Sequence, residues 1–101
     1  MLKIYSTNWE FSLLEIIYSN SFKKDVKLMK KRGKDLEKLK AFITLLISGL
    51  GIPIYYRDHK LIGNYADRRE CHLEPNWLVI YKKNSHQIIL ERTGTHSDLF
   101  K

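Results

Sequence analysis

The sequence predicts an α+β fold, in which the helices gather on one face of an antiparallel sheet. Its predicted elements run strand, helix, helix and then three strands, an order that separates helices from strands. The last three strands are joined by short turns, and strands joined in this way pair antiparallel. We therefore expect a sheet with an N-terminal helical hairpin packed on one of its faces.

The N-terminal part contributes one strand and a segment whose structure stays open. Residues 13–18 are leucine, isoleucine and tyrosine around one glutamate, the β-branched and aromatic content of a strand. We set residues 1–13 apart as an N-terminal extension of unknown role, and assign residues 14–101 to the main domain. The extension carries Trp9 and Phe11. It could form a short extra strand, a helix turn or a loose arm.

The first predicted helix is strongly basic. Ser21 is a good N-cap for a helix that runs to about Arg32 and is closed by Gly33. Phe22, Val26 and Met29 recur at the spacing of one helix face. The other positions are crowded with cations: Lys23, Lys24, Lys27, Lys30, Lys31 and Arg32. A charge run is usually a solvated face, but the scarcity of acids here favours contact with phosphate.

The second predicted helix begins after the N-cap Asp35 and ends at Gly49, Gly51 and Pro53. An apolar stripe runs along it, made of Leu36, Leu39, Ile43, Leu46 and Leu50. Residues 51–68 carry turn signals and little periodicity, so we expect a loop there.

The stretch 69–82 reads as two strands that meet at a Pro75-Asn76 turn. Alternation in the first strand sends Cys71 and Leu73 to one face, and Glu70, His72 and Glu74 to the other. The second strand contains the continuous apolar run 78–81, as expected of a strand buried on both faces. A hairpin turn at 83–85 leads into a third strand, His86 to about Thr93.

Composition restricts the class of partner and the compartment. The 101 residues suit one domain, and a net charge of +7 favours a polyanionic partner: nucleic acid, an acidic protein or an anionic membrane surface. The single cysteine, Cys71, excludes an internal disulfide and a thiolate zinc cage, which fits a reducing compartment. No apolar run approaches the roughly 18 residues of a membrane span, and no secretion signal opens the sequence. We expect a cytoplasmic protein without membrane association.

Four motifs, in order, resemble the YafQ branch of the RelE/ParE toxin superfamily. They are Tyr-Arg-Asp-His at 56–59, Arg-Glu-Cys-His-Leu-Glu-Pro at 69–75, Trp77 followed by Leu-Val-Ile-Tyr, and Arg-Thr-Gly-Thr-His-Ser-Asp-Leu-Phe at 92–100. The resemblance covers roughly residues 14–101. It implies a RelE-like α+β fold related to microbial RNases and a toxin that cleaves translated mRNA on the ribosome. The resemblance also implies a DinJ/RelB-like antitoxin partner, operator DNA binding only through the antitoxin complex, and no metal or other cofactor.

The resemblance also implies site residues. His59, His72 and His96 match the active-site histidines, whose imidazoles can give or take protons near neutral pH. Without the motifs, each has an ordinary interpretation: a histidine beside Asp58, a solvent-facing strand residue or a tail residue. Arg69, Arg92 and Lys60 are expected to hold phosphate, and Trp77 and Phe100 to position RNA. Trp77 alone would equally suit a core position.

Asn76 departs from the family, which usually has an aspartate between this proline and tryptophan. An amide cannot exchange a proton at ordinary pH, although it can position substrate or a histidine. One alternative is therefore a weak or inactive homologue that binds the antitoxin and acts with it as a co-repressor. A ParE-like gyrase inhibitor is a further alternative and ranks last, because the ParE side of the superfamily lacks this histidine set. Cys71 is expected to be a core residue, His86 a surface residue, and a zinc site of the three histidines is disfavoured because none has short ligand spacing.

Overall fold

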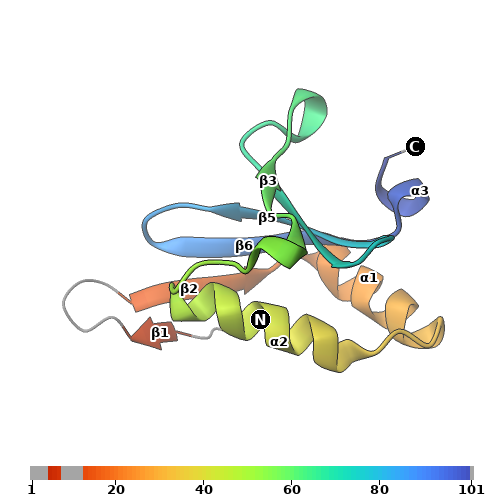
Figure 1. Ribbon diagram of the computed structural model, residues 1–101, viewed down its shortest axis with the longest axis horizontal. Coiled ribbons are helices and arrows are strands. Elements are labelled where there is room, and N and C mark those ends of the chain that lie inside the picture. The colour runs from red at the N-terminus through yellow and green to blue at the C-terminus, as the bar shows by residue number, and fades with distance from the viewer. Residues whose placement is uncertain (1–4, 8–12, 101) are drawn as a thin grey trace.

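The computed structural model describes residues 5–7 and 13–100, and it has the predicted α+β architecture (Figure 1). Its helices and strands follow the order β1 (Tyr5–Thr7), β2 (Leu13–Tyr18), α1 (Asn20–Lys31), α2 (Leu36–Ser48), η1 (Ile54–Tyr56), β3 (His59–Lys60), η2 (Gly63–Tyr65), β4 (Arg69–Glu74), β5 (Trp77–Lys83), β6 (Gln87–Gly94) and α3 (His96–Leu99). Among these, no helix is both long and apolar enough to cross a membrane.

The strands form one six-stranded sheet in the order β1-β2-β6-β5-β4-β3. Neighbouring strands pair antiparallel with one exception, because β2 runs parallel to β6. The sheet is therefore mixed, and the expectation of a purely antiparallel sheet needs this correction. The helices α1 and α2 lie between β2 and the later strands in sequence, and a parallel pair requires such a long connection.

Both predicted helices form, with one correction at each. The N-cap of α1 is Ser19 and not Ser21: the Ser19 hydroxyl accepts a hydrogen bond from the Phe22 backbone N–H at 3.0 Å. The same hydroxyl donates to the Glu91 carbonyl at 2.8 Å, which ties the start of α1 to β6. Asp35 caps α2 as predicted, but α2 ends at the left-handed residue Gly49, so Leu50 lies beyond it and is 89% exposed.

Apolar side chains cover both faces of the sheet. One face packs against α1 and α2, with a core of Phe22, Met29, Leu39, Phe42, Cys71, Val79 and Tyr81, among others. The opposite face carries a smaller cluster, made of Leu78, Ile80, Leu99, Leu61 and Tyr65. Side chains of β5 enter both clusters alternately, which confirms the prediction that this strand is buried on both faces.

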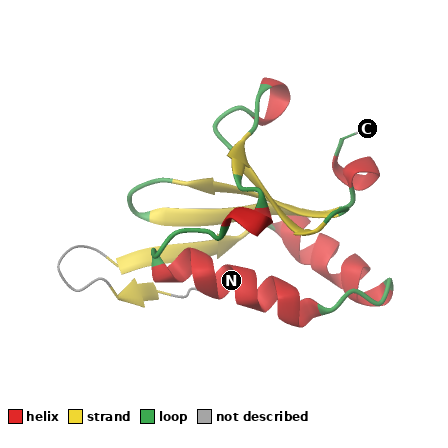
Figure 2. Ribbon diagram, in the orientation of Figure 1, coloured by secondary structure: helices red, strands yellow, loops and turns green. Residues whose placement is uncertain are grey.

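The segment 51–68 is more ordered than the predicted loop. It contains η1, η2 and the two-residue strand β3, which extends the sheet beyond β4 (Figure 2). A strand of two residues shows no periodicity in a sequence, so the pattern could not reveal it. β3 carries His59 to the edge of the sheet next to β4.

Part of the N-terminal extension is an extra strand. β1 pairs antiparallel with β2, with Tyr5 opposite Glu15 and Thr7 opposite Leu13. Of the three alternatives for the extension, residues 5–7 therefore form the short extra strand. Trp9 and Phe11 lie outside the described residues.

Candidate active site

The histidines gather on the sheet face that lies opposite α1 and α2. In β4, Cys71 points into the helix-side core, so its neighbours Glu70 and His72 point to the other face. Their cross-strand partners Ile80 and Leu78 belong to the smaller apolar cluster of that face. The alternation read from the sequence therefore holds for Glu70 and His72, and the rigid central strand β5 supports both.

The carboxylate of Glu70 contacts the imidazole of His59. His59 lies opposite Glu70 in the β3–β4 register, and its Nε2 is 2.8 Å from Glu70 Oε2. Its Nδ1 is 2.7 Å from the carbonyl oxygen of Arg57. Both ring nitrogens of His59 thus face oxygen atoms, which fixes the orientation of the ring.

His72 is the central member of the row. Its Nε2 lies 3.7 Å from the same Glu70 Oε2, and its ring centroid lies 6.1 Å from that of His59 and 5.9 Å from that of His96. Its side chain is only 10% exposed. Among the described residues, His72 Nδ1 and Glu70 Oε1 are buried without a hydrogen-bond partner, and such groups usually mark a functional site or a water position.

His96 begins α3, which is held by polar contacts. The helix has a capping box between Thr95 and Asp98, and Asp98 also accepts two hydrogen bonds from Arg32, at 2.7 and 3.1 Å. The Arg32 guanidinium, with the Thr95 backbone N–H, holds the pKa of Asp98 well below its usual range. A Cβ atom on Gly94 would approach the Asp98 side chain to 3.0 Å, so a larger residue there would crowd Asp98.

Asn76 joins the row from the β4–β5 turn. Its Oδ1 accepts a hydrogen bond from the His96 backbone N–H at 3.0 Å and lies 2.8 Å from His96 Nδ1. Phe100 closes the far end, where its ring centroid lies 6.3 Å from that of His96 and 5.4 Å from that of Tyr65. The structure thus brings together five of the predicted site residues: His59, His72, His96, Asn76 and Phe100. We name these five residues and Glu70 the histidine row.

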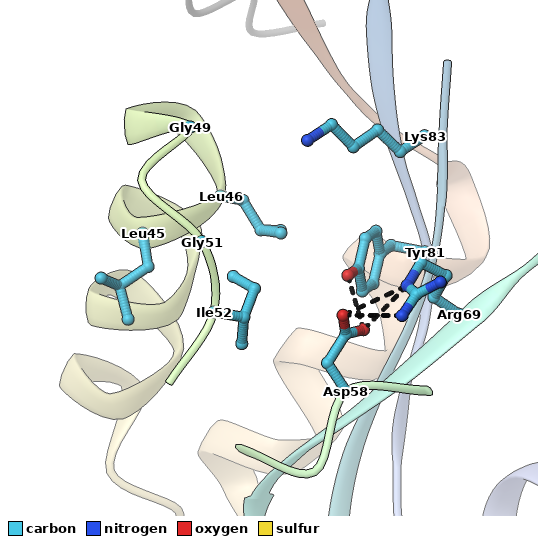
Figure 3. A pocket seen from close by; sticks show the side chains of 9 residues that line it. All are labelled: Leu45, Leu46, Gly49, Gly51, Ile52, Asp58, Arg69, Tyr81 and Lys83. Atoms are coloured by element: carbon cyan, nitrogen blue, oxygen red, sulfur yellow. Dashed lines mark hydrogen bonds and ion pairs between the residues drawn. The ribbon is translucent and has the colours of Figure 1, made fainter. Parts of the chain in front are cut away.

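Arg69 does not join the histidine row. It points to the helix side, where its guanidinium donates to Asp58 at 2.9 to 3.2 Å, and the Tyr81 hydroxyl donates to the same carboxylate at 2.7 Å (Figure 3). Burial alone would raise the pKa of Asp58, but the hydrogen bonds from Arg69, Tyr81 and Cys71 outweigh it and lower that pKa. Since Asp58 precedes His59, this network anchors the strand that carries the first histidine.

Trp77 and Lys60 also lie away from the row. Trp77 is fully buried in the helix-side core, and its Nε1 donates to the Thr93 hydroxyl at 2.9 Å. Of its two interpretations, the structure therefore supports a core residue. Lys60 alternates with His59 along β3 and lines an open groove of about 750 Å³. The other cations of this groove are Arg68, Arg69, Lys82 and Lys83.

Arg92 is the predicted arginine that lies nearer to the row. It is opposite Ile80 in the β5–β6 register, and its Nε and Nη2 donate to Asp25 of α1 at 2.7 and 3.2 Å. Asp25 also accepts from the Thr93 backbone N–H at 3.0 Å. Hydrogen bonding to Asp25 raises the pKa of Arg92, so its charge is permanent.

Glu70 is the member of the histidine row that sequence reasoning missed. The signal was present, because alternation placed Glu70 on the same face as His72. Glu74, placed there as well, turns instead to Lys34 and Lys38 at 2.9 Å each, because the register shifts between His72 and Glu74. Among the described residues, His59, Glu70 and His72 could together hold a metal ion, since their ligand atoms lie within 4.8 Å of one another.

Known structures match the fold of this chain. The chain superposes on the crystal structure of YafQ from Escherichia coli BL21(DE3) with a TM-score of 0.83 at 47% identity, covering 85% of this chain and 97% of that one. It also matches the E. coli DinJ-YafQ toxin-antitoxin complex, with a TM-score of 0.81, 48% identity and coverage of 85% and 96%. The fold of this chain is thus that of a class of small bacterial toxins.

Sequence comparison makes the assignment more specific. A family model for the bacterial toxin of type II toxin-antitoxin systems, YafQ, matches residues 14–101. The mRNA interferase toxin YafQ of E. coli K12 is 48% identical over 87 residues, which are 85% of this chain and 95% of that toxin. The chain belongs to the YafQ family of type II toxins, as the sequence motifs predicted.

Proposed function

We propose that this protein is an mRNA interferase that cuts translated mRNA on the ribosome and so inhibits translation. The observation that carries the proposal is the histidine row, in which three imidazoles from β3, β4 and α3 follow one another about 6 Å apart on one face of the sheet. Imidazole is the side chain best suited to general acid–base chemistry near neutral pH.

The reaction needs only proton transfers and charge stabilisation. The 2′-hydroxyl oxygen of one ribose attacks the adjacent phosphorus, and its proton passes to an imidazole. The bond from phosphorus to the 5′-oxygen breaks, and a second, protonated imidazole donates a proton to that oxygen. The products are a 2′,3′-cyclic phosphate and a free 5′-hydroxyl, and no water is consumed. We assign the two proton transfers to His72 and His96, with His59 supporting them as a positive charge.

The remaining predicted residues take supporting parts in this proposal. Phe100, 40% exposed at the end of the row, stacks on a base, and Arg92 stabilises charge on the phosphate. Lys60 and the neighbouring cations of the basic groove contact phosphates at a distance from the cut. Arg69 and Trp77 act indirectly, by holding β3 and β6 in place.

We further propose an antitoxin similar to DinJ as the protein partner, because the E. coli relative forms a DinJ-YafQ toxin-antitoxin complex. A net charge of +7 suits both an acidic antitoxin and the RNA of the ribosome. In this proposal the protein acts in the cytoplasm, where its substrate is, and it reaches operator DNA only through the antitoxin complex.

Asn76 supports a second candidate function. In this alternative the protein binds antitoxin but cleaves RNA weakly or not at all. The observation that favours it is the amide itself, which cannot carry a proton between groups. This candidate and the main proposal predict opposite results in the same cleavage assay.

The test is cleavage of a translated message. Purified ribosomes carrying a defined mRNA are treated with the wild-type protein, with His96→Ala, and with His86→Ala as the matched surface control. Cuts are mapped by primer extension. We expect cuts inside codons from the wild type and from His86→Ala, and a loss of about 100-fold or more in His96→Ala. Absence of cuts from folded wild type that still binds antitoxin would support the second candidate.

A further inference from the structure

We propose that Asn76 is a positioning residue that holds His96 in the Nδ1–H tautomer, so that Nε2 is the ring atom that exchanges a proton with RNA. The role toward RNA rests on the proposed function. The tautomer, in contrast, is a property of the free protein and can be measured without RNA.

The inference begins with two contacts to one oxygen. Asn76 Oδ1 lies 3.0 Å from the His96 backbone nitrogen and 2.8 Å from His96 Nδ1. An amide oxygen has two lone pairs and can accept both bonds at once. The backbone N–H can only donate, so it requires an acceptor at this position.

That requirement fixes which way the Asn76 amide points. The oxygen and nitrogen of an asparagine amide are assigned from their hydrogen bonds, because their positions look alike. Here a reversed amide would place its NH₂ group against the backbone N–H of His96, donor against donor. The backbone of α3 therefore selects the oxygen for the His96 side, and the NH₂ group of the exposed Asn76 side chain is left for solvent.

The fixed amide in turn fixes the histidine. Because Nδ1 faces an acceptor, it must carry a hydrogen in both charge states of the ring. Neutral His96 then has its lone pair on Nε2, and protonated His96 has its second exchangeable proton there. His96 is an exposed residue at the end of the row, so substrate can reach it.

An amide usually fails in this position. In the Ser-His-Asp triad, asparagine in place of aspartate lowers kcat about 10⁴-fold, because the histidine takes the wrong tautomer. The difference here is the backbone N–H of His96, which prevents the amide from reversing. Asn76 thereby orients the histidine as a carboxylate oxygen would, but without adding negative charge to the site.

The experiment reads the tautomer directly, from long-range ¹⁵N–¹H correlation spectra of the imidazoles in the free protein. The variants are Asn76→Ala, which removes the oxygen, and Asn76→Asp, which keeps one. His86, exposed in the β5–β6 turn, serves as the internal control in every spectrum. Backbone amide spectra establish that each variant is folded, and the same proteins are then assayed for cleavage on ribosomes.

We expect His96 to show the Nδ1–H pattern in the wild type and in Asn76→Asp, and to lose it in Asn76→Ala. Cleavage should fall about 100-fold in Asn76→Ala, the cost of a misplaced group, and be restored in Asn76→Asp. An Nε2–H pattern in the wild type, or an unchanged pattern in folded Asn76→Ala, would overturn the inference. A correct pattern in a protein that never cleaves RNA would instead count against the proposed function.

Discussion

Glu70 lies beneath two imidazoles and is almost completely buried, with 5% of the residue exposed. One of its oxygens binds His59 at 2.8 Å and lies 3.7 Å from His72, while the other has no partner among the described residues. A buried carboxylate is costly unless it is paired, so its position here is a cost to stability that serves the histidines.

Replacing Glu70 by Gln should therefore separate activity from stability. Glutamine keeps the size and one acceptor oxygen, but it removes the negative charge beside His59 and His72. We expect cleavage on ribosomes to fall about 10- to 100-fold, since the two imidazoles lose the carboxylate that faces them. The free energy of unfolding should change by less than about 1 kcal/mol, because glutamine can still hydrogen-bond to His59 and a contact with the half-exposed His59 adds little as an ion pair.

Urea unfolding and ribosome cleavage measure the two effects side by side. Glu37→Gln is a suitable matched control, because it makes the same chemical change at an exposed position of α2, outside the histidine row. A Glu70→Gln protein that unfolds far more easily, yet cleaves normally while folded, would show that Glu70 serves stability and not the site.

At the scale of elements, α3 is the least self-sufficient part of the site. A helix of four residues cannot hold itself together, because one helical turn does not offset the cost of nucleation. Its position depends on the capping box, on Leu99 in the smaller apolar cluster and on the contact of Asp98 with Arg32. His96 is therefore placed by residues outside the histidine row.

The variant Asp98→Asn tests this dependence. It removes the charge that Arg32 binds and weakens the cap, so His96 should lose its fixed distance from His72. We expect cleavage to fall about tenfold or more, because small misplacements of a reacting group are costly. Stability should fall by only about 1 kcal/mol, since the ion pair is on the surface. Lys40→Ala, which removes the exposed Lys40–Glu37 pair, is the control and should leave cleavage unchanged.

The elements also show which parts of the fold a sequence can reveal. Helices α1 and α2 and strands β4, β5 and β6 were predicted correctly, because each follows from local periodicity and turn residues. The parallel pairing of β2 with β6 depends on residues about seventy positions apart, as in the hydrogen bond from Gln87 to Glu15, and no local pattern contains it. The shift from Ser21 to Ser19 as N-cap has the same origin, because Ser19 is selected by its contact with β6.

The site was predictable only in part, for a related reason. The motifs selected the three histidines, but only the fold brings β3, β4 and α3 together. Arg69 and Trp77 belong to the same motifs and lie on the other face, where they hold the scaffold. A motif marks residues that the family needs, and strand alternation decides which of them can meet the substrate.

At the scale of the whole molecule, half-buried carboxylates make the free energy of unfolding depend on pH in the acidic range. Hydrogen bonds from Arg69, Tyr81 and Cys71 outweigh burial and lower the pKa of Asp58, and the bonds from Lys34 and Lys38 lower the pKa of Glu74. A carboxylate whose pKa is lower in the folded protein adds stability above its unfolded pKa. That contribution is lost as the pH falls through the folded pKa.

Stability should therefore be constant near neutral pH and decrease below about pH 4, where free carboxylates begin to protonate. Urea unfolding at a series of pH values measures this. Asp58→Asn should lower the free energy of unfolding at pH 7 by about 1.5–3 kcal/mol, the value of hydrogen bonds to a charged group. It should also flatten the acid dependence, and an unchanged dependence would mean that Asp58 is not its source.

The parallel β2–β6 pair has a consequence for synthesis of the protein. β2 is made early, but its partner β6 is the last strand of the sheet to leave the ribosome, and His96 follows it. The row therefore cannot assemble on a growing chain until nearly all of the domain has been translated, and such long-range sheets also fold slowly. If the protein has the proposed function, the unfinished chain cannot cut the mRNA of the ribosome that makes it. The antitoxin then has time to bind before the active site has formed.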